Sequence, residues 1–118
     1  MEITLRVDNE EKTFIQPFVS ARILRRTFEY DKKFQELLEA GAENFENYDR
    51  IKDLELAAEY VSEVFNNQFT AEQFLDGVES YKAVPEYTRI KRLVQTGREE
   101  AFGVTKTDNE EGKPDPNV

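Results

Sequence analysis

The sequence predicts a mainly α-helical protein (α+β), in which a short N-terminal β-hairpin packs on about four helices and a disordered, acidic C-terminal tail follows. Three observations predict this class. Apolar and polar residues alternate near the N-terminus, apolar residues then recur at three- and four-residue steps, and the composition turns polar and acidic after Gly97. A chain of 118 residues can bury one hydrophobic core but not two. We therefore expect a single helical domain with its hairpin over residues 1–97 and a flexible tail over residues 98–118.

The N-terminal segment EITLRV has the period-2 pattern of a strand whose buried face carries Ile3, Leu5 and Val7. A second β-rich segment, KTFIQ, follows the polar residues DNEE, so we expect a hairpin. Its turn type stays open because the favoured Asn-Gly pair is absent. Two strands alone are only marginally stable, so this hairpin must lie against helices, and Pro17 ends it.

The first helix is expected to begin near Ser20, whose side chain can cap the first turn, and to end at Gly41. One face should be buried, and its residues are Ile23, Leu24, Thr27, Phe28, Phe34, Leu37 and Leu38. The other face carries opposite charges at four-residue spacing, each pair worth about 0.2–0.5 kcal/mol: Arg25 with Glu29, Glu29 with Lys33, and Lys32 with Glu36. These pairs favour a solvated helix face as the simplest interpretation of the segment PFVSARILRRTFEY.

A second helix is expected from Ile51 to Phe65, where apolar residues follow the spacing of a two-heptad seam. The segment FNNQFTAEQFLDGV then predicts a structural corner. Asn tolerates the left-handed conformation at a helix end, a Thr with a Gln three residues later forms a capping box, and flanking Phe residues form a hydrophobic staple. The residues of this corner are Phe65, Asn67, Phe69, Thr70, Gln73, Phe74 and Gly77.

A fourth helix should carry Pro85 in its first turn, turn Ile90, Leu93 and Val94 inward, and close at Gly97. From residue 98 onward the chain holds six acids against three bases together with two Gly and two Pro. This composition is typical of a disordered tail.

No residue set in the chain predicts catalysis, a metal site or a cofactor. Cys and His are absent, and neither a Gly-rich phosphate loop nor a nucleophile–base set is present. Paired acids such as Asp49 with Asp53, or Glu55 with Glu59, are interpreted as solvated rather than as a cation site. The N-terminus does not resemble a signal peptide and no apolar run could span a membrane, so we expect a soluble, unexported protein without membrane contact. The net charge of −9 opposes nucleic-acid binding.

Residues 1 to about 97 resemble the tail assembly chaperones of long-tailed bacteriophages and prophages of Gram-positive bacteria. The resemblance is carried by PFVSARILRRTFEY after a short hairpin and by VSEVFNNQFTAEQFLDGV at the end of a helix. In the second segment it depends on the order and spacing of Phe65, Asn67, Gln68, Phe69, Thr70 and Gly77.

The resemblance implies a non-enzymatic protein of the host cytoplasm that is absent from the mature virion. Such chaperones bind the tape measure protein and keep it soluble while the tail tube assembles around it. Many copies act together, which implies a weak homo-oligomer. Many members also exist in a longer frameshifted form that recruits the tail-tube protein, and that protein is a second expected partner.

A partner surface is predicted on the aromatic residues that exceed the needs of a small core. Its candidates are Phe28, Phe34 and Phe45, rimmed by Arg22, Arg25 and Arg26; the alternative is that each Phe belongs to the core. Acids such as Glu55, Glu59 and Glu63 are candidates for joining neighbouring copies. Two other functions stay open: an acidic phage DNA mimic that inhibits a nuclease or repressor, and a structural head–tail connector.

Overall fold

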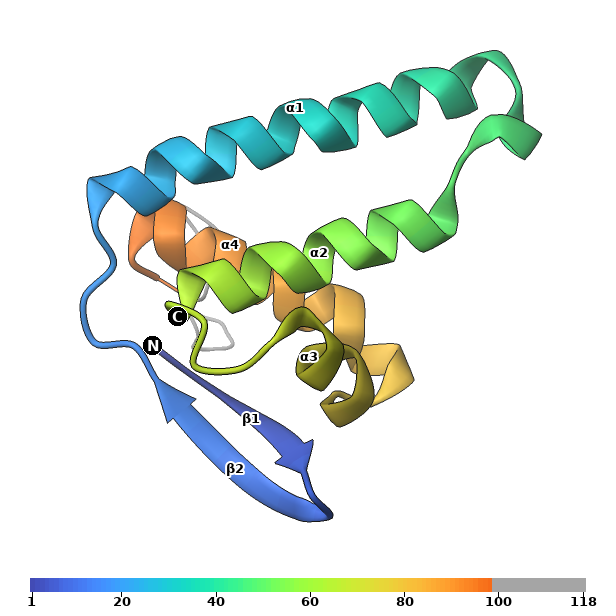
Figure 1. The fold of residues 1–118 in the computed structure, drawn as a ribbon. Coiled ribbons are helices and arrows are strands. Elements are labelled where there is room, and N and C mark those ends of the chain that lie inside the picture. Colours follow the sequence, from blue (N-terminus) through green and yellow to red (C-terminus); the bar gives the residue numbers. More distant parts are fainter. Residues whose placement is uncertain (99–118) are drawn as a thin grey trace, which may run out of the picture.

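The computed structural model describes residues 1–98, in which a layer of helices covers one face of a two-stranded sheet (Figure 1). In chain order the elements are β1 (Glu2–Val7), β2 (Glu10–Ile15), α1 (Ala21–Glu43), the 3₁₀ turn η1 (Phe45–Asn47), α2 (Arg50–Val64), α3 (Ala71–Gly77), the 3₁₀ turn η2 (Ser80–Lys82) and α4 (Ala83–Thr96). The predicted class, mainly α with an N-terminal hairpin and four helices, is confirmed. Apart from Arg98, the predicted tail lies outside the described residues.

The hairpin turns on two residues rather than on the four polar ones of DNEE. Strands β1 and β2 are antiparallel, with Val7 opposite Glu10, and only Asp8 and Asn9 lie between them. Their φ angles of 54° and 66° place both in the left-handed region, which Asp and Asn tolerate better than other side chains and which two-residue hairpin turns of this kind require. The second strand therefore begins two residues earlier than KTFIQ.

The core lies where the hairpin meets α2, α3 and α4. Helix α2 is central because it contacts α1, α3 and α4, and Ile3 and Leu5 fill the core from the β1 side. The buried cluster comprises Ile3, Leu5, Tyr30, Leu56, Ala58, Tyr60, Val61, Val64, Phe65, Phe69, Phe74, Ala83 and Ile90. Aromatic rings supply much of it: the Phe69 ring lies 5.0 Å from that of Phe14 and 5.5 Å from that of Phe65.

Helix α1 differs from the prediction at both ends. Ser20 does precede its first residue, but the Ser20 side chain makes no capping hydrogen bond. The predicted end at Gly41 is wrong, because α1 continues to Glu43. A Cβ atom on Gly41 would lie 2.9 Å from the Cβ of Tyr48, so glycine here allows a close approach instead of ending the helix. Two residues of the predicted buried face, Phe28 and Leu38, are more than half exposed.

The corner between α2 and α3 is formed by left-handed residues and side-chain hydrogen bonds. Asn66 and Asn67 have φ angles of 58° and 59°. The Ser62 hydroxyl donates to the carbonyl oxygen of Phe69 at 2.6 Å, which ties the end of α2 to the entry of α3. Buried Phe65 and Phe69 lie inside the corner. The direction of the chain after α2 is thus determined locally.

Helix α3 begins with a complete capping box and ends at a glycine. The Gln73 N–H donates to the Thr70 hydroxyl at 3.0 Å, and the Gln73 side chain accepts from the Thr70 N–H at 2.9 Å. Phe74 is fully buried. A Cβ atom on Gly77 would lie only 2.6 Å from the carbonyl oxygen of Arg6, so this glycine lets α3 contact β1.

Helix α4 carries Pro85 in its first turn and closes on Gly97, whose φ of 74° is left-handed. Ile90 is fully buried, and Leu93 and Val94 pack against the core from its edge. Within residues 1–98, no helix is long and apolar enough to cross a membrane.

Candidate partner-binding groove

An apolar groove of about 620 Å³ lies between α2, the start of α4 and the middle of α1. Its volume falls within the range of about 300–1,000 Å³ that is common for binding sites. In Figure 1 the chain turns back between α1 and α2, so these two helices run side by side, and most of the groove is lined by α2, η2 and the start of α4. The lining residues are Phe34, Tyr48, Arg50, Asp53, Leu54, Ala57, Leu75, Val78, Ser80, Ala83, Val84 and Tyr87.

Exposed apolar side chains extend this groove onto the surface. Within its lining, Leu54 is 39% exposed and Val84 is 60% exposed. Three further large apolar residues each lie one helical turn or less from a lining residue: Leu38, Ile51 and Tyr81. Contiguous apolar patches that stay in contact with water usually mark a binding surface. We define the groove together with these residues as the apolar groove surface.

The far end of the groove is closed by a hydrogen bond between η1 and α2. The Tyr48 hydroxyl donates to the Asp53 carboxylate at 2.7 Å, and this hydrogen bond, more than burial, raises the pKa of Tyr48. The Tyr48 ring also packs against Gly41. These contacts hold the C-terminal end of α1 at a fixed distance from α2, and this spacing maintains the width of the groove.

On the other side of the groove, the Tyr87 ring lies 5.3 Å from Phe34 and 5.6 Å from Tyr60, ring centre to ring centre. Burial is the main reason why the pKa of Tyr87 is raised. Its hydroxyl makes no hydrogen bond with any other residue from 1 to 98. A ligand side chain in the groove therefore finds a neutral hydrogen-bonding group in an apolar surrounding.

The predicted arginine rim lies outside this groove, and one of its members joins two helices. The Arg26 guanidinium binds both carboxylate oxygens of Glu63, at 2.8 Å and 3.2 Å, and also binds Glu29 at 2.8 Å. The Tyr30 hydroxyl donates to Glu63 at 2.6 Å, and Arg26 stacks on the Tyr30 ring. We call Arg26, Glu63 and Tyr30 the α1–α2 clasp.

The pKa values within this clasp follow from its contacts. Desolvation alone would raise the pKa of Glu63, but the hydrogen bonds from Arg26 and Tyr30 outweigh it, and the pKa is lowered. Burial, followed by the hydrogen bond to Glu63, raises the pKa of Tyr30. Glu63 is therefore a carboxylate near neutral pH and is occupied within the chain instead of being free for a neighbouring copy.

The four-residue charge pairs predicted on α1 are not formed as ion pairs. Glu29 pairs with Arg26, one position after the predicted Arg25. Asp31 pairs with Lys91 of α4 at 2.6 Å. Spacing along one helix could not predict contacts that a second helix makes available.

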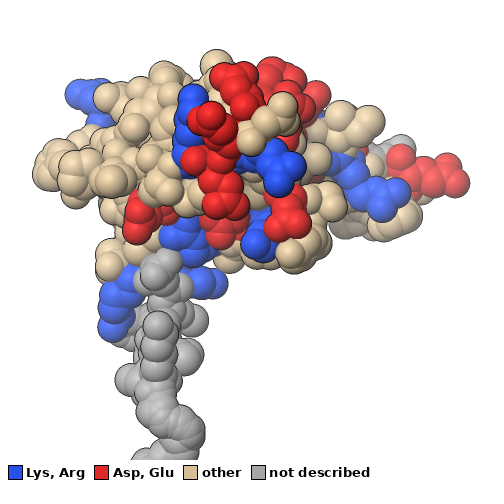
Figure 2. All heavy atoms as spheres, turned by 90° about the horizontal axis from the view of Figure 1, so that it is seen from below, with Lys and Arg blue, Asp and Glu red and all other residues tan. Residues whose placement is uncertain are grey.

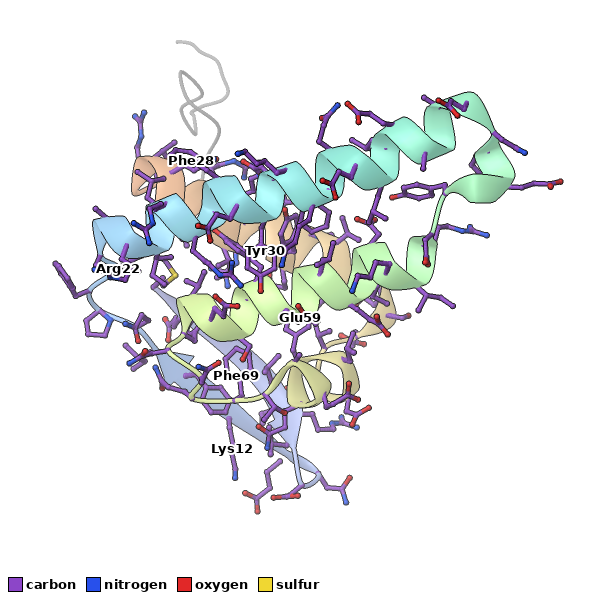
Figure 3. The ribbon with its side chains drawn as sticks, turned by 45° about the horizontal axis from the view of Figure 1, so that its top comes forward. Lys12, Arg22, Phe28, Tyr30, Glu59 and Phe69 are labelled. Atoms are coloured by element: carbon purple, nitrogen blue, oxygen red, sulfur yellow. The ribbon has the colours of Figure 1, made fainter. Side chains whose placement is uncertain are left out.

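The six predicted partner residues are therefore dispersed over the molecule. Phe34 lines the groove, whereas Phe45 is 75% exposed at the far end of α1. Phe28 lies on the N-terminal half of that helix, near Arg22 (Figure 3). The sequence prediction did not include Leu54 or Val84 among its partner residues; the available signal for Leu54 was its place in the apolar seam from Ile51 to Phe65.

On the face toward the hairpin, basic and acidic side chains are interspersed (Figure 2). A second hollow of about 850 Å³ lies there, beside β1, α3 and α4. Four of its eight charged lining residues are paired with one another: Arg89 binds Glu86 at 2.9 Å and Lys82 lies 3.3 Å from Glu79. This hollow is polar and lacks the exposed apolar rim of the groove. Within residues 1–98, no group of three or more acids could hold a metal ion.

Comparison with known proteins gives one match. Residues 1–113 match the family described as phage tail chaperone protein. Searches of curated proteins and of solved structures each found no significant match.

Proposed function

Because the chain belongs to the phage tail chaperone proteins, we propose that it acts in tail assembly by binding a helical segment of the tape measure protein in the apolar groove surface. The binding keeps that segment soluble until the tail tube encloses it. The role needs no catalysis, since the groove only has to cover apolar side chains.

The observation that supports this proposal is that the apolar groove has two exposed apolar side chains in its own lining. An amphipathic helix places apolar side chains at steps of three, four and seven residues along one face, and a groove between helices can receive such a row. Leu54 and Val84 lie within the groove and Ile51 lies on its extension. Burying these side chains stabilises the complex by about 25 cal/mol for each Å² of apolar surface removed from water.

The overall charge supports the same proposal. A long tape measure segment must be covered by many copies, which we propose associate weakly along it. A net charge of −9 on each copy limits further aggregation of the covered complex. A longer form that recruits the tail-tube protein, the host cytoplasm as the place of action, and a Gram-positive host all remain part of the proposal.

The family match favours this role over the two alternatives. A DNA mimic needs dense acids with few interrupting bases, whereas 16 Lys and Arg are distributed through this chain. A head–tail connector would remain in the virion. Detection of the protein in purified particles would support the connector and would count against a chaperone that leaves the finished tail.

Co-expression with helical segments of the tape measure protein from the same phage tests the groove. We expect the wild-type chain to keep such segments soluble and the double variant Leu54→Asp with Val84→Asp to lose this effect. The matched control is Ile15→Asp with Phe18→Asp, which changes two exposed apolar residues outside the groove lining by the same charge. Circular dichroism verifies that all three proteins are folded.

The outcomes test the identity of the client protein and the location of the binding site separately. Failure of the wild-type chain to solubilise any segment would refute the tape measure protein as the client. Equal solubilisation by the groove variant and the wild type would refute the groove as the binding site while leaving the client unchanged.

A further inference from the structure

Three residues on the N-terminal half of α1 form an exposed strip with an aromatic centre. Arg25, Phe28 and Lys32 follow one another at steps of three and four residues, so their side chains are neighbours on one face of the helix. Phe28 is 52% exposed. Neither Arg25 nor Lys32 makes an ion pair within residues 1–98. We call these three residues the α1 strip.

Two nearby acids on the same helix turns are already engaged elsewhere, and Glu36, one turn after Lys32, forms no ion pair within residues 1–98. Glu29 binds Arg26 at 2.8 Å, and Asp31 binds Lys91 at 2.6 Å. Arg25 contributes to the lowered pKa of Glu29 only after the hydrogen bond from Arg26. The positive charge of the α1 strip is therefore available to an acidic segment that reaches it.

The chain leaves the described fold next to this strip. Helices α1 and α4 run antiparallel. Tyr87 of α4 contacts Phe34 of α1, and Lys91, which follows Tyr87 in α4, contacts Asp31, which precedes Phe34 in α1. Both helices rise 1.5 Å per residue, so Arg98 lies about level with the turn that contains Arg25 and Phe28. Figure 3 shows Phe28 on the part of α1 that lies over the end of α4.

The sequence after Arg98 is complementary to the strip, because it contains acidic and apolar residues. It begins EEAFGV, so two acids precede an apolar cluster around Phe102, and residues 99–118 hold six acids against two bases. An extended chain covers about 3.3–3.6 Å per residue, so Phe102 can reach about 13 Å from Arg98. The family match continues to residue 113 and includes this segment.

We propose that residues 99–104 of the same chain dock on the α1 strip, with Glu99 and Glu100 against Arg25, Phe102 on Phe28, and Lys32 adding to the positive field at the far end of the strip. Each exposed ion pair is weak alone. The short connection compensates, because it gives the segment a high effective concentration at the strip. This inference does not depend on the groove or on the identity of the client.

A spin label tests this docking in the full chain. The chain has no Cys, so Thr107→Cys carries a single nitroxide outside the docking residues. We expect strong paramagnetic broadening of the amide signals of Arg25, Phe28 and Lys32 and none at Phe45, which is more exposed than Phe28 but lies beyond the other end of α1. Raising the salt concentration should reduce the broadening, because screening weakens exposed charge pairs.

Charge reversal supplies the matched comparison. The double variant Arg25→Glu with Lys32→Glu should lose the broadening at Phe28, whereas Lys12→Glu with Arg22→Glu, which changes the charge equally, should keep it. An unchanged amide spectrum for the remaining residues shows that each variant is folded. Weak broadening spread over the whole surface would overturn the proposal, because the segment would then be unattached. Broadening that appears when labelled chains are mixed with isotope-enriched unlabelled chains would also overturn it, because the contact would then join two copies.

Discussion

Arg26 holds α1 against α2 by binding both oxygens of one carboxylate. The sequence analysis predicted the same role, the rim of a partner surface, for Arg22, Arg25 and Arg26, since all three lie within five positions of an amphipathic helix. The structure separates them, because only Arg26 faces α2, where Glu63 lies 37 positions later in the chain. Spacing rules relate residues within one helix and cannot show which charged side chain a neighbouring helix will engage.

The clasp predicts a pH-dependent contribution to stability. Replacing Glu63 by Gln should lower the free energy of unfolding by about 1–3 kcal/mol near neutral pH, the range for hydrogen bonds to a charged group. The pKa of Glu63 is below its ordinary value of 4.5 in the folded protein. Its stabilising effect is therefore complete above that value and is lost as the pH falls through the folded pKa. Urea denaturation at several pH values measures the difference between the two proteins.

The control for this experiment is Glu59→Gln, which removes an exposed carboxylate one turn earlier in α2 that forms no ion pair within residues 1–98. We expect almost no change in stability at any pH for this variant. A Glu63→Gln effect that stays constant from pH 7 to pH 3 would contradict the assignment of the clasp to an ionised Glu63.

The capping box at Thr70 predicts a second effect of a single residue. Thr70→Ala removes the oxygen that accepts from the Gln73 N–H, so the free energy of unfolding should fall by about 0.5–2 kcal/mol. Thr70→Ser keeps that oxygen and should stay close to the wild type. Chemical denaturation compares the three proteins, and equal stability of the Ala and Ser variants would show that the box does not stabilise α3.

At the scale of elements, local signals predicted more than patterns of hydrophobicity did. The α2–α3 corner and the end of α4 at Gly97 depend on residues with special backbone preferences, and the structure has them at those positions. The hairpin was predicted from alternating apolar and polar residues, but its turn uses two residues rather than the four polar ones. The end of α1 was misplaced because Gly41 serves a contact with Tyr48 instead of a turn. The structural role of a glycine can be identified only when the residues that pack against it are known.

Gly77 predicts how strongly α3 depends on its contact with β1. In Gly77→Ala the new Cβ would lie 2.6 Å from the carbonyl oxygen of Arg6. Backbone cannot rotate away as a side chain can, so α3 and β1 must separate, at a cost of about 1–3 kcal/mol. Thermal or chemical unfolding measures the loss, and amide chemical shifts along β1 should change.

Gly97→Ala is the comparison for this prediction, because the new Cβ would meet no atom within 4 Å although Gly97 is left-handed. It should cost about 1–2 kcal/mol through backbone strain alone and leave the β1 amide shifts unchanged. If Gly77→Ala left both the stability and the β1 shifts unchanged, the close packing of α3 on the hairpin would be refuted.

At the scale of the whole molecule, the sequence predicted the fold class but only one residue of the groove. Helical periodicity identifies apolar faces. It placed Ile51 and Leu54 in a seam that packs inside the domain or at a subunit contact, and it left Phe28 either in the core or on a partner surface. Which apolar residues stay in contact with water depends on how the helices pack against one another, and that is a property of the assembled elements. Phe34 was predicted as a partner-binding residue because its side chain is aromatic. Its position in the groove depends on its contact with Tyr87 and on α2.

We propose above all that a helical segment of the tape measure protein occupies the groove lined by α2, η2 and the start of α4. Titration of the isotope-labelled full chain with such a segment, followed by amide and methyl chemical shifts, locates the contact directly. The account predicts that the largest shifts occur at Phe34, Leu54 and Val84, with little change at Ile15 of the hairpin. Saturable binding that shifts the hairpin or the α1 strip and leaves those three residues unchanged would contradict it.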